Sequence, residues 1–148
     1  MHTIDLYSYR CGVIDCFNEV IHAGIKRLAL SHPADTKEER DLYLRFSEEI
    51  CRKYHTHMYA EDDLLVTDLF PVSDTKGKYL ILYYDREETL RSYLDLKKEK
   101  VQLNNSGQYC GEARLKIAQK FGRLLSYTEE AVHQIIESNR DREKVVEA

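Results

Sequence analysis

The sequence has no tryptophan, only two prolines, and no apolar run long enough to cross a bilayer. Its longest apolar run covers residues 79–84, whereas a membrane-spanning helix needs about 20 consecutive apolar residues. The first five residues also lack the basic start and the apolar stretch of a secretory signal peptide. We therefore expect a cytoplasmic protein with no membrane-embedded part.

Neither sign of charge dominates the chain, which has 22 basic and 26 acidic residues and a formal net charge of −4. A nucleic-acid-binding protein usually concentrates lysine and arginine in a basic stripe, and no such stripe is present, so we expect no DNA or RNA partner. A length of 148 residues is enough for one core. We predict a single globular domain over residues 1–148, with a charged tail that frays from about residue 140.

Four cysteines are present, and none has the Cys-x-x-Cys spacing of redox proteins or zinc ribbons. Without an export signal, and with a core that does not depend on disulfides, we expect reduced thiols. Tyrosine is abundant, with 11 residues, and tyrosines are common at protein interfaces. The composition thus favours a homo-oligomer.

Apolar residues at three- and four-residue spacing predict most of the chain to be helical. Pro33 is expected to end the first helix, and the Thr36 hydroxyl with Glu39 forms a capping box that opens the second. The short connection between these two helices predicts an antiparallel helical hairpin. A weaker pattern predicts a short strand before the first helix, over residues 3–9. The expected helices cover residues 12–30, 36–54, 86–101 and 111–125, with a last one opened by a capping box at residues 126–129.

Between the helical regions, the spacing of the apolar residues changes to the pattern of β-strands. Residues 64–70 and 79–84 are predicted strands, and residues 73–78 have the composition of a turn. The second strand is apolar on both faces, which predicts a central position in its sheet. The fold class is therefore α+β: a helix-rich domain with an N-terminal helical hairpin, a central β-hairpin in a small, mostly antiparallel sheet, and three C-terminal helices.

The densest group of chemically versatile side chains lies in residues 51–63, with one thiol, two imidazoles and three carboxylates. Cys51, His55, His57 and Asp62 are candidate ligands for a divalent metal such as zinc. Glu61 could serve as a further ligand or as the general base for a metal-bound water. A site requires that the two imidazoles converge with at least one further ligand. If they do not, the segment is a helix end followed by a solvated acidic turn.

Cys110 is a second candidate for chemistry, because it directly precedes a predicted helix. A thiol at a helix N-terminus is acidified by the helix dipole and by free N–H groups. Those N–H groups, with Arg114 nearby in sequence, could also bind an anion. The alternative is an inert cysteine, which is the commoner outcome for an isolated thiol.

Two classes of function are compatible with these patterns. The first is a small cytosolic binding or regulatory protein that acts through a helical, tyrosine-containing surface and self-associates. The second is a metal-dependent hydrolase or lyase that uses the His55 and His57 cluster, with thiol chemistry at Cys110 as a further alternative.

Overall fold

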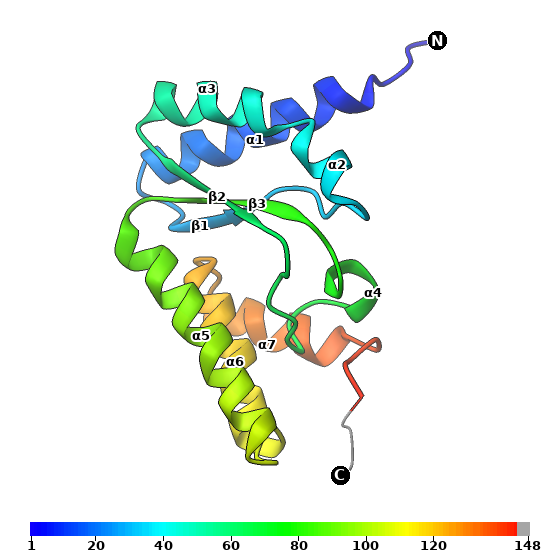
Figure 1. Ribbon diagram of the computed structural model, residues 1–148, viewed down its shortest axis with the longest axis vertical. Coiled ribbons are helices and arrows are strands. Elements are labelled where there is room, and N and C mark those ends of the chain that lie inside the picture. Colours follow the sequence, from blue (N-terminus) through cyan, green and yellow to red (C-terminus); the bar gives the residue numbers. More distant parts are fainter. Residues whose placement is uncertain (145–148) are drawn as a thin grey trace. The chain divides into compact units, whose positions relative to one another are not determined.

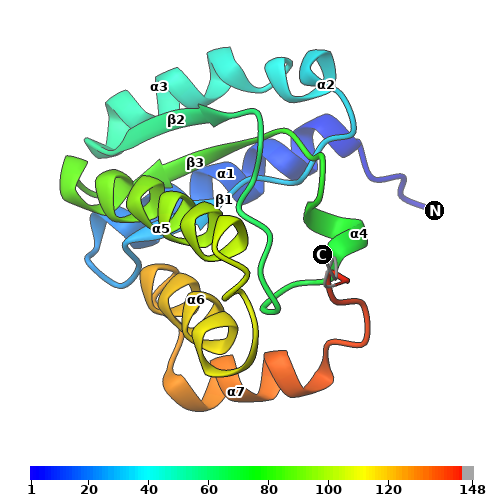
Figure 2. The ribbon, with the colours of Figure 1, turned by 60° about the horizontal axis from the view of Figure 1, so that its bottom comes forward.

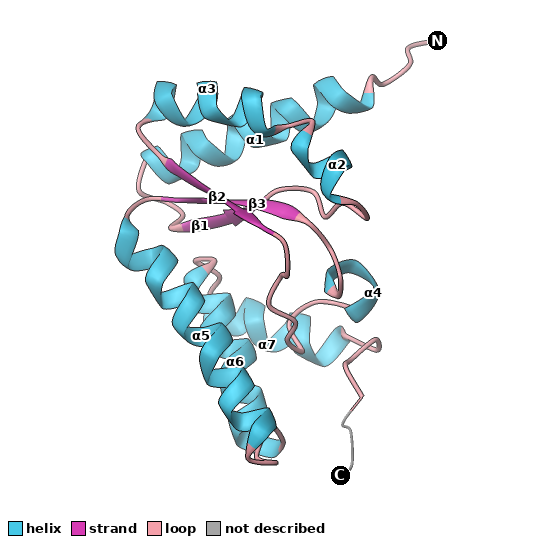
Figure 3. Cartoon of the chain, in the orientation of Figure 1, coloured by secondary structure: helices cyan, strands magenta, loops and turns pink. Residues whose placement is uncertain are grey.

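A computed structural model describes residues 1–144, in which seven helices and three strands are formed (Figure 3). The expected α+β class is confirmed, with a small antiparallel sheet. No helix among these residues is long and apolar enough to cross a membrane. The helices are α1 (Leu6–His22), α2 (Lys37–Asp41), α3 (Leu44–Tyr54), α4 (Val72–Thr75), α5 (Glu87–Asn105), α6 (Gly111–Leu124) and α7 (Glu129–Ser138), and the strands are β1 (Leu28–Leu30), β2 (His57–Glu61) and β3 (Leu80–Tyr84).

The chain divides into two compact units, each built from two separate segments. The sheet unit contains residues 1–63 and 77–86, and the helical unit contains residues 64–76 and the chain from Glu87 onward. The expectation of a single domain over residues 1–148 stays a prediction. Each unit has its own architecture and is described separately below.

In the sheet unit, the strand order is β1-β3-β2, and both pairings are antiparallel (Figure 1). All five residues of β3 are buried, so the predicted central position of this strand is confirmed. Helices α1 and α3 lie side by side over one face of the sheet (Figure 2). The predicted helical pair is therefore present, but β1 is inserted in its connection, which is longer than expected.

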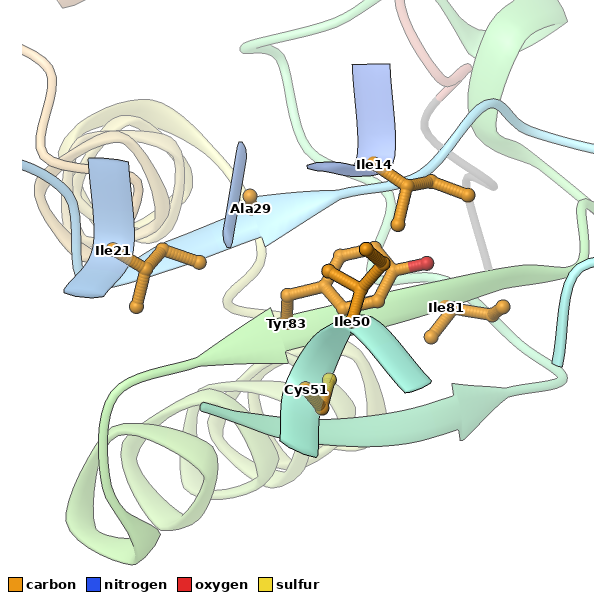
Figure 4. Packing of buried hydrophobic residues seen from close by; sticks show 7 residues of the cluster. All are labelled: Ile14, Ile21, Ala29, Ile50, Cys51, Ile81 and Tyr83. Atoms are coloured by element: carbon orange, nitrogen blue, oxygen red, sulfur yellow. The ribbon is translucent and has the colours of Figure 1, made fainter. Parts of the chain in front are cut away.

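The core of the sheet unit lies between this helical pair and the sheet. Figure 4 shows Tyr83 at its centre, with isoleucine side chains of both helices directed toward the sheet. The hydroxyl group of Tyr83 lies 2.6 Å from Ser47 Oγ, so the one polar atom of this buried ring has a partner. The cluster consists of Ile14, Ile21, Ala29, Ile50, Cys51, Ile81 and Tyr83.

The start of α1 corrects two predictions. Residues 3–9 are not a strand, because the Asp5 carboxylate accepts a hydrogen bond from the backbone N–H of Ser8 and caps a helix that begins at Leu6. The helix then ends eight residues before the predicted end at residue 30, and β1 follows. Its buried residues are Cys11, Ile14, Asn18 and Ile21.

The second predicted helix begins as expected but is interrupted. The Thr36 hydroxyl accepts a hydrogen bond from the backbone N–H of Glu39, at 3.1 Å, which confirms this cap. The helix is interrupted just after α2, at Leu42, which is 64% exposed. The apolar spacing in the predicted helices places Leu42, Val101 and Leu115 inward, but all three are exposed.

Residues 64–70 are buried, but they do not form the predicted strand. Two of their backbone polar groups are bonded by side chains of α5 rather than by a neighbouring strand. Tyr93 Oη accepts from the Leu65 N–H at 3.1 Å, and Lys100 Nζ donates to the Val66 carbonyl at 2.8 Å. Because these partners replace a β-ladder, an apolar and buried segment remains irregular.

In the helical unit, α5 packs beside α6, and α6 packs beside α7. The predicted helix over residues 111–125 is confirmed as α6. Gly122 allows the last of these contacts, because a Cβ atom at this position would lie 2.4 Å from the side chain of Val132. The cap of α7 is Thr128 rather than Ser126, since the Thr128 hydroxyl accepts from the backbone N–H of Ala131.

The charged tail was expected to fray from about residue 140, which stays a prediction, and residues 141 and 143 make specific hydrogen bonds. The carbonyl oxygen of Asp141 accepts a hydrogen bond from the backbone N–H of Val72 at 2.9 Å. The Glu143 carboxylate accepts one from Lys100 Nζ at 2.8 Å. Specific partners in the helical unit thus hold this part of the tail, and the rest of it lies outside the described residues.

Candidate functional site

Cys51, the first predicted metal ligand, is part of the core of the sheet unit (Figure 4). The residue is only 7% exposed, and its Sγ lies 3.8 Å from the side-chain amide oxygen Oδ1 of Asn18. Burial raises the pKa of this thiol, because a thiolate is disfavoured away from water. The residue therefore contributes to packing and is protonated at neutral pH.

The two predicted histidine ligands are exposed and contact different groups. His55 ends α3 in the left-handed conformation, with φ of 57°, and its ring centroid lies 6.4 Å from that of His22. His57 begins β2 and stacks on Tyr84, with ring centroids 5.4 Å apart. The sharp backbone turn between α3 and β2 thus places each imidazole beside a different neighbour.

The predicted acidic groups already have partners in the sheet unit. Glu61 is buried, and its Oε1 accepts from the backbone N–H of Asp63 at 3.0 Å. Asp62 pairs with Arg40, at 2.7 Å, and with Lys37, at 3.8 Å. The hydrogen bond from Arg40 lowers the pKa of the Asp62 carboxyl below its usual range.

Among residues 1–144, no three histidine, cysteine, aspartate or glutamate side chains gather closely enough to hold a metal ion. The convergence that a metal site requires at residues 51–63 is therefore not met here. The segment is instead a helix end, the strand β2 and a bend at Asp62 and Asp63, so the alternative of a helix end followed directly by a solvated acidic turn is met only in part, because Glu61 is buried in the strand. We do not propose a metal-dependent hydrolase or lyase on this basis.

Cys110 occupies the expected position, as the N-cap residue of α6, and its side chain is exposed. Arg114, the cation expected to assist there, is committed elsewhere. Its Nε and Nη2 donate to the Asp68 carboxylate at 2.9 and 2.8 Å, and Nη2 also donates to the Glu143 carbonyl at 2.6 Å. Thiol chemistry at Cys110 stays a prediction, without a second group that supports it.

The burial of the four cysteines predicts two classes of thiol reactivity. Cys16 and Cys110 are exposed, whereas Cys11 and Cys51 are buried and burial raises their pKa values. We expect iodoacetamide at pH 8 to modify the exposed pair at least about tenfold faster than the buried pair, because only thiolates react and buried ones are scarce. Peptide mass spectrometry over time measures the four rates. Equal rates at Cys51 and Cys110 would contradict the described packing, and all four should react equally in denaturant.

The sheet unit contains a cavity of about 410 Å³ beside the first half of α1. Its wall is completed by the segment that follows β1, by Arg40 of α2 and by Tyr43, the residue before α3. Leu6 and Tyr9 belong to the wall and are 55% and 59% exposed, so the cavity opens to solvent. Most of the remaining lining is apolar and includes Val13, Ile14, Phe17, Leu30 and Pro33.

No protein-family model, curated protein or solved structure matches this chain, so its function is argued from this geometry.

The cavity was not predicted from the sequence, because its wall combines residues 6–17, 30–34 and 40–43. One signal was available. Arg10 is the only lysine or arginine among the first 25 residues, and it lies at helical spacing from Leu6, Val13 and Phe17. A lone cation within an apolar stripe indicates a site where a charge is kept next to apolar surface. The predicted helix began after Arg10, so this pattern was missed.

Proposed function

We propose that this is a small cytosolic binding protein that holds a small apolar ligand in the cavity beside α1. The observation that carries the proposal is the cavity itself, which is open, mostly apolar and about 410 Å³ in volume. Ligand sites in proteins are typically concave and apolar, with volumes of about 300–1,000 Å³ and a few polar groups. Tyr9 and Tyr43 belong to the wall, in keeping with a helical, tyrosine-containing binding surface.

The proposal predicts saturable binding of an uncharged apolar probe such as N-phenyl-1-naphthylamine, measured by its fluorescence increase. Val13→Trp places a large ring in the cavity wall and is expected to weaken binding by at least about tenfold, the equivalent of about 1.4 kcal/mol. Val101→Trp is the matched control, since Val101 is an exposed residue of the helical unit. It is expected to leave the affinity unchanged.

A second measurement does not depend on the folding of the Val13 variant. The chain has no tryptophan, so Tyr9→Trp introduces one fluorophore at the exposed rim of the cavity. Its emission should shift to shorter wavelength as an apolar ligand binds, and the emission of Val101→Trp should not. Failure of the neutral probe to bind the natural protein, or equal binding by both valine variants, would overturn the proposal.

Self-association is the second candidate and is favoured by exposed apolar side chains at the start of α1. The exposed fractions are 74% for Ile4, 45% for Tyr7 and 59% for Tyr9. Soluble monomers rarely cluster large apolar side chains at the surface, so this group favours an interface. Sedimentation velocity should show a dimer that forms with increasing concentration and is lost in the variant Ile4→Ser/Tyr7→Ser. A monomer at every concentration would exclude this candidate.

A further inference from the structure

The charged side chains in the wall of the cavity are cationic. Arg10 and Arg40 line it, together with His32, and no aspartate or glutamate does. Removing a cation from water beside an apolar cavity raises its free energy unless an anion compensates the charge. The electric field of the cation is also stronger there than in bulk water. The wall is therefore complementary to an anion with an apolar part.

The two arginines differ in what they already bind. Arg40 donates to the Asp41 and Asp62 carboxylates at 2.8 and 2.7 Å, and to the backbone carbonyls of Glu61 and Leu80 at 3.0 and 3.1 Å. Its side chain is only 2% exposed. Arg40 thus connects elements of the sheet unit, and four of its five N–H groups are already used within it.

Arg10, in contrast, has only two long contacts. Its Nη1 lies 3.4 Å from Glu39 Oε1 and 3.4 Å from the Tyr43 hydroxyl, and its other N–H groups make no hydrogen bond to residues 1–144. A well-formed bond between a guanidinium and a carboxylate measures about 2.7–2.9 Å. The Arg10 side chain is nevertheless mostly buried, at 16% exposed. Arg10 is therefore a mostly buried cation whose remaining N–H groups are not taken up by the protein and can turn to a ligand.

Glu39 can give up this weak pairing at little cost. Its side chain is 37% exposed, so water can solvate its carboxylate when Arg10 turns to another acceptor. An incoming carboxylate can accept two parallel N–H bonds from one guanidinium, which a single long contact to Glu39 does not provide. The exchange replaces one long contact by the two-bond geometry that the arginine fork favours.

We propose that the ligand is an amphipathic organic acid, whose carboxylate is bound by Arg10 and whose apolar tail occupies the cavity. This rests on the proposed function and names the chemical class of its ligand. Burial of the tail against Val13, Phe17 and Leu30 supplies affinity. Arg10 selects a ligand whose head group is negatively charged.

His32 adds a consequence for pH. Its pKa is below the usual value, first because neighbouring atoms remove water from the imidazole and then because Arg10 repels its charged form. Lys78 also lowers it, whereas Glu39 and Asp35 raise it. A bound carboxylate would raise the pKa of His32, so binding takes up a proton, and affinity falls as pH rises through the raised pKa.

The test compares three ligands of equal length and different charge, below their micelle concentrations, by calorimetry. Decanoate is expected to bind at least about tenfold tighter than decanol, because hydrogen bonds to charged groups contribute at least this much to affinity. Decylamine is expected to bind most weakly of the three. Arg10→Met should bind decanoate and decanol equally while keeping its affinity for decanol. Arg45→Met removes the same charge from an exposed position outside the cavity wall and should behave like the natural protein.

The outcomes separate this inference from the proposed function. If decanol and decanoate bind equally to the natural protein, the anion preference is rejected and the apolar cavity still stands as a site. If decanoate is preferred but Arg10→Met keeps the preference, Arg10 is not the anchor. If none of the three ligands binds, the proposed function itself fails. Proton uptake, measured in two buffers of different ionisation heat, should disappear in His32→Gln.

Discussion

Replacing Asp68 by alanine is expected to lower the free energy of unfolding by about 3–5 kcal/mol, the usual cost of removing one partner of a buried ion pair. Asp68 and Arg114 form a two-bond pair at 2.9 and 2.8 Å, and their side chains are 9% and 12% exposed. Without the carboxylate, a largely buried guanidinium in the helical unit keeps only the Glu143 carbonyl as acceptor. Chemical denaturation followed by circular dichroism measures the change.

The control is the exposed pair of Lys120 and Glu99, which are 3.0 Å apart with side chains 46% and 42% exposed. Glu99→Ala should cost less than about 1 kcal/mol, because solvent screens this pair. The double variant Asp68→Ala/Arg114→Met should recover part of the loss, since it leaves no buried charge unpaired. Equal effects of Asp68→Ala and Glu99→Ala would show that the buried pair does not hold the helical unit.

Replacing Tyr83 by alanine is expected to lower the free energy of unfolding by about 3–5 kcal/mol, as for other large-to-small changes in a core. Tyr83 is fully buried at the centre of the cluster in Figure 4, and its hydroxyl pairs with Ser47. Truncation removes the ring that α1 and α3 cover. The loss of stability therefore has two causes, the cavity that is left and the Ser47 hydroxyl that loses its partner. The same denaturation experiment measures it.

Two matched variants divide this effect into its parts. Tyr83→Phe keeps the ring and removes only the hydroxyl, which should cost about 1–3 kcal/mol because the buried Ser47 hydroxyl loses its partner. Tyr9→Ala truncates a tyrosine that is 59% exposed and should change stability by less than about 0.5 kcal/mol. If Tyr83→Ala costs no more than Tyr9→Ala, the described core is wrong.

Predictions from the sequence succeeded where the pattern was long and local. The run over residues 79–84 is apolar at every position, and only a strand covered on both faces accommodates it, which is how β3 is placed. The helix over residues 111–125 has an uninterrupted 3.6-residue period. The Thr36 cap depends on residues only three apart, so it too was read correctly.

Predictions failed where a distant partner determined the local structure. Residues 64–70 have a strand-like composition, but Tyr93 and Lys100 bond two of their backbone groups and no strand pairs with them. β2 has a mixed polar composition and is a strand because β3 offers it a ladder. At residues 51–63 the spacing allowed convergence of the imidazoles, yet each has a different ring as its neighbour.

The amino-acid sequence by itself determined the α+β class, the central strand, most helices and the lack of a membrane-spanning run. These properties follow from the periodicity and chemistry of neighbouring residues. Tertiary structure alone decided which side chains meet: Cys51 became a core residue, Asp68 met Arg114, and α1 came to line a cavity with Arg10 in its wall. Such contacts join residues far apart in the chain, and no local pattern encodes the distance between them.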